Sequence, residues 1–305
     1  MTDDPNSDYP RDMIGYGKEP PAADWPGDAR TAVQFVINYE EGAENCVLHG
    51  DAASEAFLSD IVGAAPIEGA RHMNMESLYE YGSRAGFWRL HRIFAAQKVP
   101  VTIFAVAMAL RRNPEVVAAM QDAGWEIASH GLRWIDYQFV DEDTERLHLE
   151  EALAMHTAAT GERPFGWYLG RCSPQSHRLA AELGDFIYNA DSYADDVPYW
   201  DYQFERPQLM VPYTLDNNDM RFATAQGFNS GEQFFAYLKD SFDVLHAEGG
   251  RMMSVGLHCR LAGRPGRAAA VARFVDYVRS YDDVWIATRL DIANHWRDRY
   301  PASGA

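Results

Sequence analysis

The chain has 305 residues, 47% of them apolar, and a formal net charge of −18 at pH 7. This length can bury a large core, and the acidic charge disfavours nucleic acid and anionic membranes as partners. No apolar run reaches the roughly 18 residues of a membrane span, and the acidic N-terminus does not resemble a signal peptide, so we expect a cytoplasmic protein.

Residues 1–30 are irregular and rich in Pro, Gly and Asp, which break helices and strands. They also contain Tyr9, Tyr16 and Trp25, aromatic residues that are unusual in a disordered tail. We therefore expect an ordered N-terminal arm that packs on the catalytic domain or on a neighbouring subunit.

Short apolar runs then alternate with segments of helical periodicity, apart from a long polar connection at residues 43–82. The expected strands are 31–38, 99–106, 125–129, 164–169, 186–189, 209–215, 252–257 and 284–288. The expected helices are 84–97, 113–123, 143–160, 174–183, 230–248 and 267–281.

This alternation indicates a parallel sheet with helical crossovers, and strands that are apolar on both faces fit a sheet covered by helices. Seven or eight such units suit a closed barrel better than an open sheet, and no GxGxxG follows the first strand. The expected fold class is α/β, a distorted TIM-like (β/α) barrel of seven or eight strands that forms one catalytic domain over residues 31–305.

Polar residues follow several of the expected strands, where parallel barrels place their chemistry. Glu40 and Glu41 follow the first strand, and His130, Arg171 and His258 follow later ones. Any one of them alone would be a capping or salt-bridged loop residue. Together they predict one catalytic site, in which a buried glutamate acts as general base on water.

Adjacent residues at a strand end point to opposite faces, so only one of Glu40 and Glu41 can readily face the barrel mouth. Gly42 permits a bend that would change this, so the identity of the base stays open. A pair of solvated carboxylates at the start of a loop is the alternative.

Three cysteines, Cys46, Cys172 and Cys259, lie far apart and form no CxxC pair. This pattern disfavours a disulfide framework and a structural zinc site. Cys172 and Cys259 each adjoin a candidate site residue, but strand neighbours point apart, so we expect packing side chains rather than a nucleophile.

In this order the polar strand ends resemble the motifs of the polysaccharide deacetylase (NodB-homology) family. The resemblance covers residues from about 31 to 290 and implies that family's barrel. The matching stretches are Asn38-Tyr-Glu-Glu-Gly42, Ser129-His-Gly-Leu-Arg-Trp134, Arg171-Cys-Ser-Pro174 and Leu257-His258, with residues 195–200 as a looser match to an acidic motif.

Family members bind a divalent metal at the positions that match Glu41, His130 and Trp134 here. An indole has only an N–H donor, and one His with one Glu is too few ligands for a tight zinc site. We therefore expect no metal and no other cofactor. A shifted alignment that recruits His148 or His156 is disfavoured, because both lie on an expected helix.

Longer polar segments are similar to the metal-independent bacterial allantoinase branch of this family. That resemblance implies conversion of allantoin to allantoate in purine degradation by a homotetramer. The matching segments are residues 9–17, 75–86, 129–137, 211–222 and 256–261.

A hydantoin nitrogen between two carbonyls leaves more readily than an amine, so a base and oxyanion donors, worth about 2–4 kcal/mol each, replace the metal. Glu41 or Glu40 is the expected base, Arg171 and His130 stabilise the oxyanion, and His258 protonates the leaving nitrogen. For binding, Trp134 is expected to stack on the ring, and the further candidates are Tyr39, Asn217, Asn218 and Asp219, three of which also form a plain turn signal.

Three other functions stay open. A cyclic imidase or related cyclic-amide hydrolase would differ only in how the pocket fits the ureido tail. A metal-dependent carbohydrate deacetylase would need bound zinc and a long open groove, and a pure binding module would not need the catalytic set. The expected partners are a small cyclic ureide and further copies of this chain.

Overall fold

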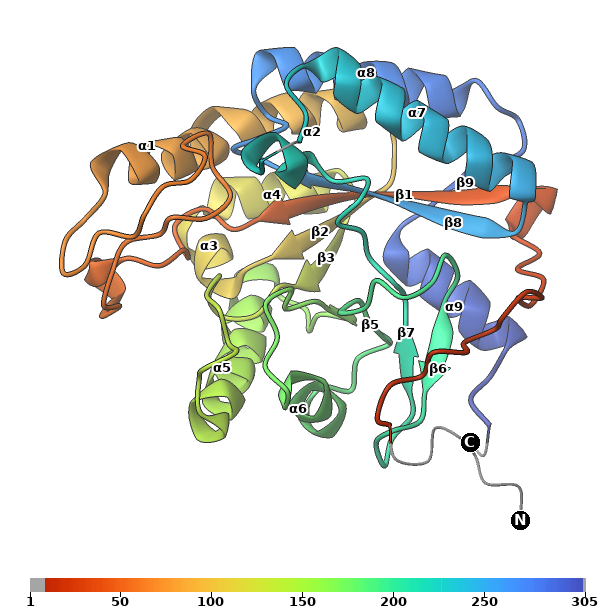
Figure 1. Ribbon diagram of the computed structural model, residues 1–305, viewed down its shortest axis with the longest axis horizontal. Helices are drawn as coiled ribbons and strands as arrows, with labels where there is room; N and C mark the ends of the chain where they lie inside the picture. The colour runs from red at the N-terminus through yellow and green to blue at the C-terminus, as the bar shows by residue number, and fades with distance from the viewer. Residues whose placement is uncertain (1–8, 226, 304–305) are drawn as a thin grey trace.

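The computed structural model describes residues 9–225 and 227–303, and its centre is one strongly curved sheet (Figure 1). β1 (Thr31–Tyr39) lies in the middle, between the parallel strands β2 (Val101–Ala105) and β8 (Arg251–His258). β9 (Val284–Ile286) pairs with the start of β1. Beyond β2 the sheet continues through β3 (Glu126–Ser129), β4 (Gly166–Trp167), β5 (Tyr188–Asn189) and β7 (Gln208–Met210), and β6 (Tyr199–Asp201) is antiparallel to β7.

Helices cover the outside of this sheet, with α2, α7 and α8 above β1 and β8 in Figure 1 and with α5 and α6 at the opposite end. A π-helical turn at Gly82–Gly86 joins α1 to α2, and short 3-10 turns occupy Pro26–Asp28, Val47–His49 and Asp219–Ala223. The α-helices are α1 (Met73–Tyr81), α2 (Phe87–Ala96), α3 (Ala107–Arg112), α4 (Pro114–Asp122), α5 (Glu142–Thr160), α6 (Ser176–Leu183), α7 (Gly231–Glu248), α8 (Pro265–Arg279) and α9 (Arg289–Arg299).

The expected α/β barrel is confirmed, although the sheet curls into an incomplete barrel. Loops bridge the open side: the Gly256 N–H donates to the Asn217 carbonyl at 2.9 Å, and the Met252 N–H donates to the Asp196 carbonyl at 2.9 Å. The carboxyl ends of the parallel strands therefore share one rim.

Three α-helices were not predicted from the sequence. One is the short α3, which lies between the expected strand 99–106 and the expected helix 113–123. α1 lies within the segment expected to be a polar connection. It was not predicted because only two of its side chains, Met75 and Tyr79, are buried, which leaves no clear apolar face in the sequence. α9 also has few apolar residues, but Thr288 and Asp291 form a capping box at its start, which is a sequence signal of a helix N-terminus.

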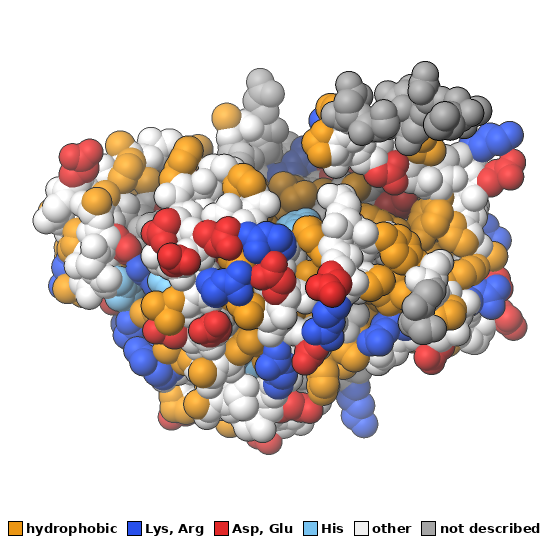
Figure 2. Space-filling model, turned by 90° about the horizontal axis from the view of Figure 1, so that it is seen from below, with side chains coloured by type: hydrophobic (Ala, Val, Ile, Leu, Met, Phe, Trp, Pro, Cys, Tyr) orange, Lys and Arg blue, Asp and Glu red, His pale blue; other side chains and the backbone are white. Residues whose placement is uncertain are grey.

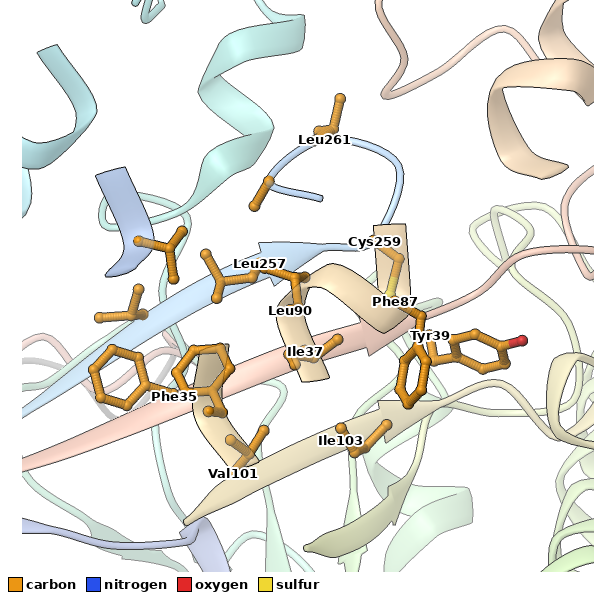
Figure 3. Packing of buried hydrophobic residues seen from close by; sticks show 14 of the residues in the cluster. Phe35, Ile37, Tyr39, Phe87, Leu90, Val101, Ile103, Leu257, Cys259 and Leu261 are labelled. Atoms are coloured by element: carbon orange, nitrogen blue, oxygen red, sulfur yellow. The ribbon is translucent and has the colours of Figure 1, made fainter. Parts of the chain in front are cut away.

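The two faces of β1 pack in different environments, as the alternation of a strand requires. Phe35, Ile37 and Tyr39 point toward α2, where they pack near Phe87 and Leu90 in the main core (Figure 3). The alternate residues face the inside of the barrel. Among them are Val36, which belongs to a second apolar cluster, and Asn38 and Glu40, which line a cavity.

The described part of the N-terminal arm contacts the barrel. The Trp25 indole N–H donates to the Arg251 carbonyl at 3.0 Å, and the Tyr16 hydroxyl donates to the Pro198 carbonyl at 3.0 Å. Residues 1–8 of the expected arm lie outside the described residues. A contact of the arm with a neighbouring subunit stays a prediction.

The surface over α5 and α6 carries ion pairs despite the negative net charge. Arg178 lies 2.6 Å from Glu142, and Arg146 lies 2.8 Å from Glu182. Figure 2, which looks from that side, shows acidic and basic side chains next to one another.

Within the described residues, no helix is both long and apolar enough to cross a membrane.

The packing of β1 against the helices predicts a large stability effect at Phe35. Its ring lies 5.1 Å from Phe94 and 6.2 Å from Phe274, and its side chain is fully buried. The Phe35→Ala substitution should lower the free energy of unfolding by about 3–5 kcal/mol, measured by urea denaturation. The control Phe139→Ala removes a ring that is 93% exposed and should change it by less than about 0.5 kcal/mol. Equal losses in the two variants would contradict this description of the core.

Candidate active site

A small cavity of about 60 Å³ opens where the strands end. Four of the expected catalytic residues line it together, namely Glu40, His130, Arg171 and His258. Aromatic side chains form much of the remaining wall, namely Phe57, Trp134, Tyr168 and Tyr213. The cavity therefore combines a small charged region with flat apolar surfaces.

Glu40 lies at the centre of the charged region and is 1% exposed. Its Oε1 is 3.2 Å from His130 Nε2 and 3.5 Å from His258 Nε2, while its Oε2 is 2.7 Å from Arg260 Nη1. Burial raises the pKa of Glu40, but Arg260 and His258 oppose it, and the resulting pKa lies well below the usual range. Glu40 is therefore a carboxylate at neutral pH.

Glu41 is directed to the other side of β1. Its Oε2 accepts the Glu40 backbone N–H at 3.1 Å, and a Cβ placed on Gly82 would lie 2.2 Å from its Oε1. Glu41 lines a separate surface pocket together with Glu44 and other residues, and not the cavity that contains Glu40. The chain does turn at Gly42, where φ is +90°, but this bend leaves Glu41 outside.

Burial raises the pKa of Glu41 to about 7, although Arg260 acts in the opposite direction. Two adjacent glutamates thus have very different proton affinities. The one in the cavity is the stronger acid, and the one behind it is close to half-protonated near neutral pH.

His258 is held by Asp219. The Nδ1–H donates to Asp219 Oδ1 at 2.6 Å, and Asp219 Oδ2 also accepts the backbone N–H groups of His258 and Ala262 at 2.7 and 2.8 Å. Burial lowers the pKa of His258, but Glu40 and Asp219 outweigh it and raise the pKa to about 9. The protonated imidazole therefore directs its Nε2–H toward the cavity.

His130 approaches Glu40 from the end of β3. Because Glu40 is an acceptor, the 3.2 Å contact requires the proton on His130 Nε2. The His130 ring packs 4.8 Å from Tyr168, and among the described residues Nδ1 has no hydrogen-bond partner. In the structure His130 therefore contacts the Glu40 carboxylate and orients it, whereas the sequence suggested that His130 is an oxyanion donor.

Arg171 lies over two rings at the edge of the cavity. Its guanidinium carbon is 5.1 Å from the centre of the Trp134 ring and 5.5 Å from that of Phe57. Its Nη1 is 3.9 Å from Glu55 and lacks a hydrogen-bond partner in the described part of the chain. Arg171 therefore has a donor available for a carbonyl oxygen of a ligand.

Only some of the expected binding residues line the cavity. Trp134 lies in the cavity wall and stacks on Phe57 at 6.0 Å with 13° between the planes. Asn218 also lines the cavity, but its amide donates to the Thr214 carbonyl and accepts the Met220 N–H. Asn217 does not line the cavity, and Asp219 acts on His258 rather than on a ligand.

The assignment of Tyr39 to substrate binding is corrected by the structure. Tyr39 shares the outer face of β1 with Phe35 and Ile37 (Figure 3). Its hydroxyl is 2.9 Å from Ser83 Oγ. The two-residue period of the strand places it on the face opposite to Glu40. Cys259 packs on that outer face as well, and burial raises the pKa of its thiol well above the usual range, as suits a packing cysteine.

Arg260 was missed by the sequence prediction. It follows β8 by two residues, is 1% exposed, and lies between Glu40 and the rings of Tyr79 and Trp134. The signal in the sequence was its place directly after Leu257-His258-Cys259, but its distance from the strand end gave no indication that its side chain reaches Glu40.

The donor set does not fit a divalent metal ion. Trp134 has no lone pair to offer, Glu41 faces away, and the guanidinium of Arg260 already neutralises Glu40. Within the described residues, no group of three or more His, Cys, Asp or Glu side chains is arranged to hold a metal. The expectation of a metal-independent reaction stays a prediction.

Comparison with known proteins places these features in a family. The family model described as polysaccharide deacetylase matches residues 74–184, from α1 to α6. The "Putative polysaccharide deacetylase" of Schizosaccharomyces pombe is 39% identical over 95% of this chain and 98% of that protein.

Two crystal structures are also very similar. A probable polysaccharide deacetylase from Pseudomonas aeruginosa is 60% identical, with a TM-score of 0.95 over 97% of this chain and 100% of that one. A PuuE allantoinase is 57% identical, with a TM-score of 0.95 over 97% of this chain and 99% of that one. The expected resemblance to the family is thereby confirmed.

The contact between His258 and Asp219 predicts a pH dependence. His258 should titrate near pH 9 in NMR spectra, and Asp219→Asn should move that midpoint down by about 1 unit or more. A raised pKa stabilises the fold fully below the unfolded value of about 6.5, and this contribution is lost as the pH rises through 9. The free energy of unfolding should therefore fall over that window more steeply in the wild type than in Asp219→Asn.

The matched control for this titration is Asp216→Asn, which changes a largely exposed carboxylate of the same segment that bonds to Tyr237. It should leave the midpoint of His258 unchanged. A midpoint for His258 near 6.5 in the wild type would show that Asp219 and Glu40 do not act on it as described.

Proposed function

Because this chain belongs to the polysaccharide deacetylase family, we propose that it is a hydrolase that opens the hydantoin ring of allantoin to give allantoate. The observation that carries the proposal is the ionised Glu40 between two histidines in a cavity with aromatic walls. The similarity to a PuuE allantoinase supports the choice of substrate, since it extends over 97% of the chain.

The arrangement can hydrolyse a ring amide with its own side chains. Glu40 takes a proton from water while the water oxygen bonds to a ring carbonyl carbon. Arg171 and the protonated His258 stabilise the oxyanion that forms. The ring C–N bond then breaks, and His258 gives its Nε2 proton to the departing nitrogen.

Glu40 and His258 can return to their starting protonation states by one proton transfer between them. After the ring opens, Glu40 is protonated and His258 is neutral, and their Oε1 and Nε2 atoms are 3.5 Å apart. Transfer of the proton from Glu40 to His258 restores the starting state. Water is the only reactant consumed, so the reaction needs no further group.

The cavity wall fits a flat, polar ring. Trp134 and Phe57 offer parallel faces, and Arg171 lies against both of them with an unpaired donor. Such a surface can stack on a hydantoin and bond to one of its carbonyl oxygens. A polysaccharide chain would instead require an extended groove.

The first test is turnover without metal ions. Protein dialysed against a chelator should convert allantoin to allantoate at the rate of untreated protein, and added zinc should not raise that rate. The same protein incubated with N-acetylated sugar oligomers should release no acetate, and with succinimide it should react much more slowly. Zinc-dependent acetate release together with inert allantoin would favour the deacetylase, and rapid opening of succinimide would favour a cyclic imidase.

The second test separates the two glutamates. Glu40→Gln removes the base in the cavity and should lower kcat by about 10²- to 10⁴-fold, with a smaller change in KM. Glu41→Gln changes a side chain outside the cavity and should lower kcat much less. The exposed Glu80→Gln serves as the control and should match the wild type. A greater loss in Glu41→Gln than in Glu40→Gln would reassign the base.

A further inference from the structure

We infer that Arg260 is a positioning residue. Its guanidinium fixes the orientation of the Glu40 side chain and keeps Glu40 a carboxylate for the reaction. This inference rests on the proposed function, in which Glu40 is the base. It concerns a residue that acts on substrate only through Glu40.

The position of Arg260 is fixed by three segments of the chain. Its Nε–H donates to the Leu58 carbonyl at 2.9 Å. Its guanidinium carbon lies 4.2 Å from the centre of the Tyr79 ring of α1 and 4.9 Å from that of Trp134. A planar cation packed on aromatic faces and 1% exposed cannot swing out to solvent.

The guanidinium determines which oxygen of Glu40 is free to act. Its Nη1 lies 2.7 Å from Glu40 Oε2, and the angle makes this a close ion pair rather than an aligned hydrogen bond. Oε1 then faces His130 and His258 on the cavity side. Glu40 therefore presents one oxygen to a reacting water while the other is held by charge.

The same cation also lies near the carboxylate on the opposite face of β1. Nη1 of Arg260 is 3.7 Å from Glu41 Oε1, so one guanidinium lies between the two neighbouring glutamates. The closer contact is with Glu40, which is consistent with the lower pKa of Glu40 and the raised pKa of Glu41 on its other side. Trp134, which cannot ligate a metal, supplies a face for this organic cation instead.

The charged and titratable groups that face Glu40 are few. Among the described residues they are His130 after β3, His258 at the end of β8, Cys259 and Arg260 in the loop after it, Tyr79 of α1, and the neighbouring Glu41. Burial raises the pKa of Glu40, and the charge of Arg260 is the largest single effect that lowers it. Loss of Arg260 would raise the pKa of this buried carboxyl and widen the pH range in which it is neutral and cannot accept a proton from water.

The experiment compares Arg260→Met, Arg260→Lys and a matched control, Arg264→Met, which removes an arginine of the same loop that pairs with Asp60. Two quantities are measured in each protein: the acidic limb of kcat/KM against pH, and the titration of the Glu40 carboxyl carbon by ¹³C NMR. The Glu40 signal is assigned by its loss in Glu40→Gln.

In Arg260→Met, both the acidic limb and the Glu40 midpoint should rise by about 1–3 pH units. In Arg260→Lys the charge remains, so both should stay near the wild-type values, while kcat falls because an ammonium lacks the flat stacking surface. Arg264→Met should match the wild type in both measurements. A residue that only stabilised the fold would shift neither quantity.

An unchanged Glu40 midpoint in folded Arg260→Met would overturn the inference. If that variant does not fold, Arg260→Met/Glu41→Gln removes one of the two carboxyl groups left without a cation and is measured in its place. The titration needs no substrate, so it still decides the role of Arg260 if the wild type does not act on allantoin. In that event only the proposed function fails.

Discussion

The structure of the site depends on the burial of four charged groups that neutralise one another. Glu40 and Asp219 carry negative charge, Arg260 and His258 carry positive charge, and each is at most about 5% exposed. A buried charge without a partner costs several kcal/mol, so removal of any member leaves another uncompensated. The cluster therefore ties together β1, the end of β8, the loop after it and the turn at Asp219, and it gives the rim of the barrel one arrangement.

Much of this rim could be predicted from the sequence, because polar residues directly after apolar runs mark strand ends. Glu40, His130 and His258 do converge, as expected from parallel strands that share one edge. The choice between Glu40 and Glu41 could not be made in this way, since both faces of β1 are largely apolar. The available signal was the series Gln34, Asn38 and Glu40 at even spacings, which places the polar residues of β1 on its inner face.

The same alternation explains the error at Tyr39, which shares its face with Phe35 and Ile37. Arg260 shows a different limit of sequence reasoning. Its role depends on a chain that turns back after β8 and on aromatic surfaces from Tyr79 and Trp134, far away in the sequence. Since α1 was itself not predicted, no pattern in the sequence could have placed Tyr79 beneath the guanidinium.

Glu40 and Glu41 show how strand geometry can divide chemical roles between identical neighbours. Both carboxyl groups are buried and both lie near Arg260, yet the pKa of one is well below the usual range and that of the other is about 7. The difference arises because the chain directs Glu40 toward two histidines and into the closer contact with Arg260 Nη1, whereas Glu41 faces the backbone of Gly82. Pairs of titratable groups whose surroundings separate their pKa values are typical of acid–base sites. In the proposed reaction the inner member has the histidines needed to return its proton and the outer member does not, so the orientation of one strand would select the base.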